Sequence, residues 1–162
     1  MLICYQSIGV IHTPFSVPQG VPIQPPSARG VQGRVELDAQ YAPGLKDLDG
    51  FSHLLLLYHF HLSSDCELRV KPFLDETPRG LFATRAPRRP NPIGLSLVRL
   101  ERIQGTTLHV LDVDIVDGTP LLDIKPYVPM FRNDDAVRIG WLTGKDQQAR
   151  HQRADDRFQP KS

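Results

Sequence analysis

The chain has 162 residues, a length that suits one domain with a sizeable core and is short for two. Its 40% hydrophobic and 23% charged residues are typical of a folded globular protein and exclude a disordered or fibrous one. The formal net charge of +1 excludes a general attraction to nucleic acid, so any such contact must come from a local cluster of charge.

Two cysteines and the lack of a long apolar run bear on the compartment. Cys4 and Cys66 have no close spacing, which excludes a disulfide framework and a zinc ribbon and favours reduced thiols. No segment reaches the roughly 18 apolar residues of a membrane span, and residues 1–10 carry no basic leader. We therefore expect a cytoplasmic protein with no membrane partner.

Short apolar runs in the first half predict strands separated by irregular loops. Residues 8–11 read as a first strand, and residues 17–29, which hold four prolines, must form an irregular loop. The alternation over residues 31–37 predicts a half-buried strand, and residues 43–48 predict one or two helical turns. Residues 51–62 are the most apolar segment and predict a buried central strand.

A strand over residues 51–62 would place His53, His59 and His61 on one face. Alternate histidines are a geometry that suits a metal ion. No aspartate, glutamate or cysteine clearly shares that face, so we predict no metal and give these side chains a ligand-lining or hydrogen-bonded role.

The second half continues the β pattern. Residues 68–73 and 80–83 predict two short strands, and residues 93–103 and 106–115 predict a hairpin around Gln104 and Gly105. Residues 121–124 predict a last short strand. Because so many short strands would leave open edges, the sequence predicts a mainly β protein, a single-domain antiparallel β-barrel with irregular loops.

The C-terminal part differs from the barrel in composition. Residues 144–158 are polar, with almost no apolar face, and predict a weak helix or a tail whose root Trp141 and Leu142 anchor. We expect a barrel domain over residues 1–131 and a polar C-terminal extension over residues 132–162.

The chain is organised around a proline-rich stretch, residues 82–96. Each proline fixes its own φ and biases the preceding residue toward extended geometry, so the stretch should be stiff. Six arginines and one glutamate lie between Thr77 and Leu111, which makes this region a local basic patch. A stiff loop that carries arginines can bind an anionic ligand with little ordering entropy left to lose.

Several common enzyme motifs are missing. No G-x-G-x-x-G follows a strand, no P-loop is present, and Ser96 does not stand in a G-x-S-x-G elbow. The residues alone therefore indicate a β-rich domain with a basic, proline-stiffened site beside a carboxylate-bearing segment.

The amino-acid sequences of five separated blocks indicate a particular protein family, which the composition cannot do. Residues 84–96 read TRAPRRPNPIGLS and residues 117–127 read DGTPLLDIKPY, with IGVI at 8–11, QP at 24–25 and GFSHL at 50–54. Together they resemble the TrmO (YaeB-like) family over roughly residues 5–130. Members of that family are tRNA methyltransferases that use S-adenosylmethionine to methylate threonylcarbamoyl-adenosine next to the anticodon. The chain resembles the compact members, which lack a C-terminal domain.

The resemblance implies a cofactor pocket in the barrel near a two-fold homodimer interface. Arg85 would pair bidentately with the methionine carboxylate, and the backbone of residues 114–117 would hold the adenine edge. Carried over block by block, the cofactor contacts would be Gln24, Pro25, Pro26, His61, Leu62, Arg85, Leu95, Asp114, Ile115, Val116 and Asp117.

The remaining polar residues of these blocks would serve the substrate. Threonylcarbamoyl-adenosine bears a carboxylate within a phosphate-lined tRNA anticodon loop, which predicts contacts with Arg88, Arg89, Asn91 and Lys125. Asp117, Asp123 and Tyr127 are alternative acceptors for the proton that the methylated nitrogen loses. The competing hypothesis is a non-catalytic regulatory barrel that keeps a cofactor or nucleoside pocket.

Overall fold

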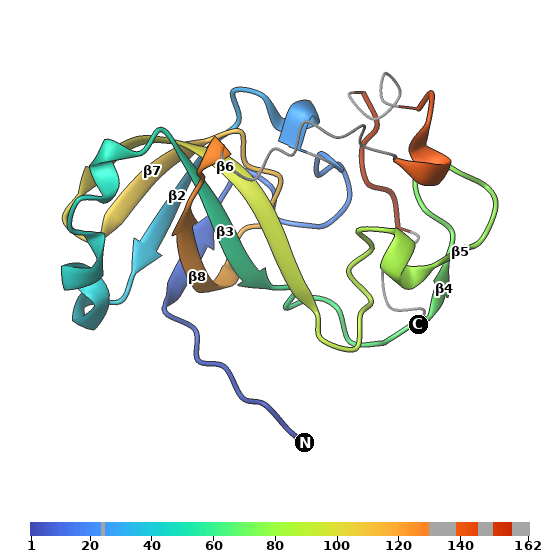
Figure 1. Ribbon diagram of the computed structural model, residues 1–162, viewed down its shortest axis with the longest axis horizontal. Helices are drawn as coiled ribbons and strands as arrows, with labels where there is room; N and C mark the ends of the chain where they lie inside the picture. Colours follow the sequence, from blue (N-terminus) through green and yellow to red (C-terminus); the bar gives the residue numbers. More distant parts are fainter. Residues whose placement is uncertain (24, 130–138, 146–150, 157–162) are drawn as a thin grey trace.

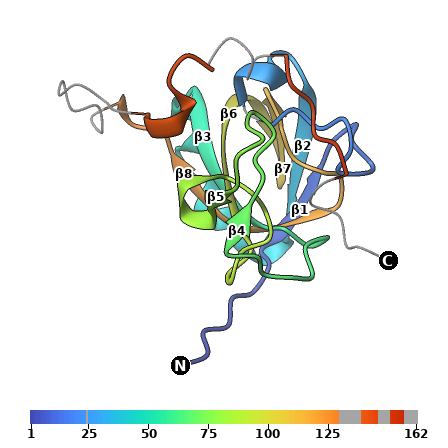
Figure 2. The ribbon, with the colours of Figure 1, turned by 90° about the vertical axis from the view of Figure 1, so that its right-hand side faces the viewer.

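Six antiparallel strands close into a barrel in the computed structural model, which describes residues 1–23, 25–129, 139–145 and 151–156. The order around the barrel is β1-β2-β7-β6-β3-β8. Figures 1 and 2 show the barrel from two sides. The mainly β, antiparallel barrel predicted from the sequence is confirmed. The strands are β1 (Gly9–His12), β2 (Gln32–Leu37), β3 (His53–His59), β6 (Ile93–Gln104), β7 (Thr107–Leu111) and β8 (Thr119–Pro126).

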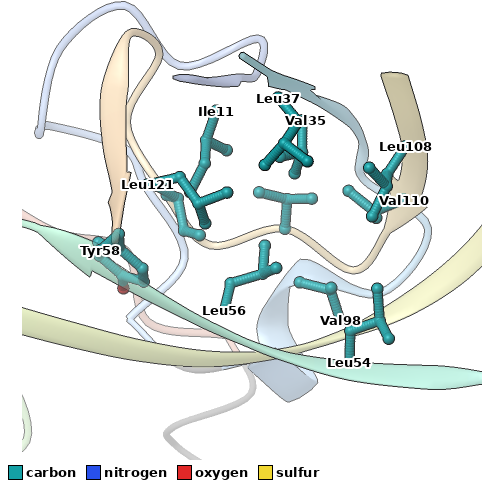
Figure 3. Close-up of a cluster of buried hydrophobic side chains, with 12 residues drawn as sticks. Ile11, Val35, Leu37, Leu54, Leu56, Tyr58, Val98, Leu108, Val110 and Leu121 are labelled. Atoms are coloured by element: carbon teal, nitrogen blue, oxygen red, sulfur yellow. The ribbon is translucent and has the colours of Figure 1, made fainter. Parts of the chain in front are cut away.

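Side-chain alternation along the strands fills the barrel. In β3 every second residue is buried, so Leu54, Leu56 and Tyr58 point inward, and in β2 Val35 and Leu37 do the same. These side chains meet others from every strand in one apolar core (Figure 3). The core consists of Ile11, Val35, Leu37, Leu54, Leu56, Tyr58, Val98, Leu108, Val110, Val113, Ile115 and Leu121.

The central strand differs from the prediction in one respect. It is shorter than residues 51–62, and its second face, with His53 and His59 at the ends, is only half-buried. A strand in a closed barrel has one face inside and one outside, so burial on both faces is not available to it. His61 lies beyond the end of β3, so it does not share a strand face with His53 and His59 as predicted.

A second, smaller layer lies beside the barrel. It holds the two-stranded sheet β4 (Arg69–Val70) and β5 (Arg79–Gly80) and the 3₁₀ turns η4 (Leu81–Ala83) and η6 (Gly140–Leu142), seen at the right of Figure 1. Three further 3₁₀ turns are η1 (Pro25–Ala28), η2 (Ala39–Leu45) and η3 (Leu48–Gly50). The proline-rich stretch leads from this layer into β6.

Several boundaries differ from those predicted. The expected strand over residues 106–115 ends as β7 at Leu111, because Asp112 has φ 69° and its carboxylate accepts a hydrogen bond from the Gly30 amide. The expected strand over residues 80–83 is mostly the turn η4, and the expected strand over residues 68–73 keeps only two residues as β4. The two η turns over residues 39–50 replace the short helix predicted for residues 43–48.

The described part of the C-terminal segment returns to the barrel. The Gly20 amide donates to the Ala154 carbonyl and the Ala154 amide to the Val21 carbonyl, at 2.8 and 2.9 Å. The predicted anchor Trp141 donates from Nε1 to the Ala83 carbonyl at 2.8 Å. Of the expected helix or tail over residues 144–158, residues 146–150 and 157–158 lie outside the described residues, and residues 144–145 and 151–156 form turns and extended backbone with no helix. Within the described residues, no helix has the length and apolarity needed to cross a membrane.

Candidate functional site: a cavity at the barrel rim

A cavity of about 810 Å³ opens between one rim of the barrel and the outer loops. This volume lies within the range of small-molecule and cofactor sites. Six described segments supply its walls: the first loop, the end of β3, Phe73 in the loop between β4 and β5, the proline-rich stretch, residues 114–119 and the C-terminal segment. Most of the wall is apolar, with Phe60, Leu62, Ile93 and Ile115 among the lining residues.

Three polar side chains form a hydrogen-bonded chain at the floor of the cavity. Ser96 Oγ donates to Asp114 Oδ1 at 2.5 Å. Because this bond uses the only hydrogen of the Ser96 hydroxyl, Tyr58 Oη must be the donor of the 3.0 Å bond to Ser96 Oγ. Tyr58 and Ser96 are almost completely buried. Gly94 makes room for the Tyr58 ring, since a Cβ at position 94 would lie 2.2 Å from it.

Burial determines how these groups titrate. Desolvation raises the pKa of Asp114, against the Ser96 hydrogen bond and the positive charge of Arg85, which both lower it. Desolvation, followed by the nearby Asp114 carboxylate, also raises the pKa of Tyr58. The cavity floor therefore carries one buried carboxyl group whose charge a positive ligand would stabilise.

Arg85 supplies a cation beside this carboxyl group. It lines the cavity, and one guanidinium nitrogen donates to the Leu95 carbonyl. Its guanidinium influences the pKa of both Asp114 and Tyr58, so its charge lies close to the cavity floor. With its remaining donors, Arg85 can pair with an anionic ligand group.

His61 is a further titratable group that lines the cavity. Desolvation, and then repulsion from His59, lower the pKa of His61 and keep the ring neutral near pH 7. Its Nδ1 lies 3.3 Å from Thr119 Oγ1, whose hydrogen is donated to the Val116 carbonyl at 2.7 Å. The His61 ring must then donate from Nδ1, which leaves Nε2 as the proton acceptor.

Most of the residues predicted to bind the cofactor meet in this cavity. His61, Leu62, Arg85, Leu95, Asp114, Ile115 and Val116 all line it. Pro25 and Pro26 begin η1, and the first loop contributes Pro22 and Ile23 to the described lining. Gln24 lies outside the described residues. Asp117 follows the lining residue Val116 but is not itself in the lining.

The residues predicted to contact RNA are in different settings. Arg88 donates to Asp65 and Glu67 at 2.8 and 3.0 Å and is only 12% exposed, so its charge is already paired. Arg89 lines the cavity and donates to the Thr84 and Ala86 carbonyls.

The other two RNA candidates lie apart from each other. Asn91 is exposed within the proline-rich stretch. Lys125 is paired with Asp123 at 2.7 Å on β8, outside the cavity lining.

The structure does not bring the three proposed proton acceptors together. Asp117 accepts hydrogen bonds from the Thr13 amide and from His12, and the Thr13 bond is the main cause of its lowered pKa. Asp123 pairs with Lys125, and Tyr127 packs edge-on against His53 at the opposite end of β3 from the cavity. None of the three is part of the cavity lining.

Sequence reasoning missed Tyr58, Ser96 and the C-terminal residues Ala154 and Asp155. Tyr58 and Ser96 carry a readable signal, because both fall on inward positions of strands with clear alternation. Ala154 and Asp155 join the lining through the pairing of their segment with the first loop. No local sequence pattern predicts such a contact. Among the described residues, no three histidine, cysteine or acidic side chains are grouped so as to hold a metal ion.

The fold and the cavity define a closed six-stranded antiparallel barrel protein with a cofactor-sized, arginine-bearing site at one rim. The chain belongs to the tRNA-methyltransferase O family, because the family model of the tRNA-methyltransferase O N-terminal domain matches residues 10–133. The resemblance read from the five sequence blocks is thereby confirmed.

Relatives and solved structures agree with this family. A probable S-adenosyl-L-methionine-binding protein of Pyrococcus abyssi is 51% identical over 158 residues, covering 98% of this chain and 86% of that protein. The tRNA (adenine(37)-N6)-methyltransferase of Escherichia coli is 40% identical over 135 residues, covering 77% of this chain and 57% of the enzyme. The crystal structure of TrmO from Pseudomonas aeruginosa superposes with a TM-score of 0.72 at 37% identity, covering 87% of this chain and 63% of that one. The chain thus spans less than two thirds of these two longer relatives.

Proposed function

We propose that the chain binds S-adenosylmethionine in the rim cavity and transfers its methyl group to the N6 atom of an adenosine in tRNA. The observation that carries this proposal is the combination, in one cavity of about 810 Å³, of apolar walls with Arg85 and Asp114. The relatives named as S-adenosyl-L-methionine-binding proteins and as tRNA (adenine(37)-N6)-methyltransferases support the same cofactor and reaction.

The residues of the cavity fit the chemistry of this cofactor. Arg85 can pair with the methionine carboxylate, and the buried Asp114 carboxyl group can face the positive charge of the sulfonium or the amine. Residues 114–116 offer backbone groups to the adenine edge, and Leu62 and Leu95 contribute apolar side chains to the same lining. The cofactor supplies an activated methyl group with its own leaving group, so the task of the protein is alignment.

His61 is the base that the cavity presents to the acceptor nitrogen. Its neutral ring carries the unprotonated Nε2, whereas the carboxylate of Asp117 is committed to Thr13 and His12 and has a lowered pKa. A group with a pKa near neutrality accepts a proton more effectively than a strongly acidic one. We therefore assign proton acceptance to His61 in preference to Asp117, Asp123 and Tyr127.

The finer substrate assignment is threonylcarbamoyl-adenosine next to the anticodon. Its carboxylate and the surrounding phosphates need cations, and Arg89, which lines the cavity together with Arg85, can meet them. Because Arg88 is paired with two carboxylates, we assign it to the loop structure and not to RNA.

Methyl transfer is tested with purified protein, methyl-labelled S-adenosylmethionine and two tRNA pools, with and without threonylcarbamoyl-adenosine. We expect label in the first pool only, located by nucleoside mass spectrometry at the modified adenosine. Label in both pools would support the methyltransferase and reject the finer substrate. Cofactor binding by calorimetry without label in any tRNA would instead favour the non-catalytic barrel.

A further inference from the structure

Phe82 is an exposed aromatic side chain with no structural explanation inside the described fold. It belongs to η4, where its neighbour Leu81 is fully buried, yet 77% of Phe82 is exposed. The Arg89 guanidinium carbon lies 5.7 Å from the centroid of its ring. One side of the ring is thus covered by a cation while most of the side chain is open to a partner.

Arg89 is itself held in place. Its Nη1 donates to the Thr84 and Ala86 carbonyls at 3.1 and 3.2 Å, within a stretch that Pro87 and Pro90 stiffen. Phe82 and Arg89 therefore form a pair with little conformational freedom to lose on binding. Such a pair can receive one planar group and one anionic group side by side.

A second, smaller cavity lies next to this pair and connects it to the cofactor site. It measures about 350 Å³, and Phe82, Leu74 and Trp141 are among its mainly apolar lining residues. Arg85 and Thr84 line both cavities, so a group bound beside Phe82 would be next to the proposed methyl donor.

Charge on this face favours an anionic partner. Arg79 and Lys145 lie over the Trp141 ring at 5.6 and 5.3 Å and share Asp75 as an ion-pair partner. Two cations share that one carboxylate, and Arg89 adds a further positive charge while it donates to neutral backbone carbonyls. The local charge on the described residues is therefore positive.

We propose that Phe82 and Arg89 form a stacking platform for an unpaired RNA base adjacent to the methylated adenosine, with Arg89 facing its phosphate. The inference rests on the proposed function and names how its substrate is gripped. Unpaired bases offer a free π-face and stack on aromatic side chains, whereas bases inside a duplex are already stacked on one another. The platform thus selects single-stranded RNA such as an anticodon loop.

The test compares variants in binding to a fluorescein-labelled anticodon stem-loop RNA, followed by anisotropy. Phe82→Ala should weaken binding roughly five- to 150-fold, the effect of losing one base-aromatic stack, and should leave the salt dependence unchanged. Phe82→Trp should retain the wild-type affinity. Arg89→Ala should weaken binding and lower the salt slope by about one. Tyr5→Ala removes a similarly exposed aromatic, 70% accessible, ahead of β1 and should have no effect.

Further measurements separate this inference from the function on which it rests. Phe82→Ala should bind S-adenosylmethionine and a blunt RNA duplex as the wild type does. Wild-type affinity of Phe82→Ala for the stem-loop would overturn the platform while leaving the methyltransferase proposal intact. A Phe82→Ala protein that changes its sedimentation coefficient would overturn it in favour of a contact between two copies of the chain. Failure of the wild type to bind either S-adenosylmethionine or stem-loop RNA would overturn both.

Discussion

Asp114 shows how one buried side chain can join fold and function. Its carboxyl group is placed by Ser96, which is in turn fixed by Tyr58, and Gly94 leaves the space that the Tyr58 ring needs. The sequence predicted Asp114 as a cofactor contact through its backbone, from the family resemblance. It could not show the hydrogen-bonded side chain, because that depends on β3, β6 and residue 114 meeting at one rim.

Stability should depend on pH through Asp114. Because burial raises its pKa, the contribution of this group is fully present below its unfolded value of about 4 and is lost as pH rises through the folded value. Urea unfolding from pH 3.5 upward should show the wild type losing stability relative to Asp114→Asn, in which the side chain cannot ionise. Parallel pH profiles for the two proteins would mean that Asp114 is not desolvated.

His61 should act on turnover more than on binding. His61→Gln keeps a polar side chain of similar size but cannot accept a proton, and general-base catalysis typically contributes about a hundredfold or more. We expect kcat to fall by that order while KM for tRNA changes little, and the rise of the wild-type rate with pH near the His61 pKa should disappear. A pH profile retained in His61→Gln would assign the proton to another group.

The proline-rich stretch shows how an element can combine rigidity with charge. Besides its prolines, it is tied to the segment after β3 by Arg88, by the Glu67 amide on the Arg88 carbonyl and by Ser63 Oγ on the Pro87 carbonyl. A stiff, basic loop was predicted from composition. The ion pairing of Arg88 was not predicted, because Asp65 and Glu67 carry no pattern that marks them as its partners.

Substitutions of the arginines in this stretch should therefore have different effects. Arg85→Ala removes the group that we propose to pair bidentately with the cofactor carboxylate, so the affinity of this variant for S-adenosylmethionine should fall ten- to a hundredfold. Arg85→Lys keeps the positive charge but lacks the planar guanidinium that allows bidentate pairing. Its affinity for S-adenosylmethionine should therefore lie between those of the wild type and Arg85→Ala.

Arg88→Ala is the matched control in the same stretch. It should bind cofactor and RNA as the wild type does, and lower the free energy of unfolding by about 1 kcal/mol, since its partners are half-exposed. Calorimetry and urea unfolding on the same preparations measure both effects. Normal cofactor affinity in Arg85→Ala would remove Arg85 from the site.

At the scale of the whole molecule, local sequence patterns predicted the strands, whereas pairing between distant segments determines which residues line the cavity. Alternation gave Val35 and Leu37 their inward positions, and the turn at Gly105 gave the β6-β7 hairpin. The contact of Ala154 with the first loop joins segments from opposite ends of the chain, and no local propensity specifies it. The family resemblance supplied much of what local physics could not, namely which residues from distant segments line one cavity.

The outer face of β3 and β6 bears on how many copies of the barrel assemble. A barrel exterior in water should be polar, yet Leu57 stands opposite Leu95 and Leu55 opposite Leu97, and Ile93 is exposed beside them. Leu95 and Ile93 also line the rim cavity, so a partner seated on this face would complete the wall of the proposed cofactor site. We propose a two-fold homodimer through this face, since one apolar patch can then cover its own copy.

Leu57→Lys tests the dimer, because a charge on the outer face of β3 would have to be buried in the interface. We expect the wild type to sediment as a dimer at micromolar concentration and Leu57→Lys as a monomer. Affinity for S-adenosylmethionine should drop in parallel, since the cavity loses the partner's wall. Thr107→Lys places the same charge on the outside of β7, next to Glu36, and should remain dimeric. A wild type that sediments as a monomer and binds S-adenosylmethionine with full affinity would show that one barrel is enough to form the site. The apolar face of β3 and β6 would then have to be covered by another partner.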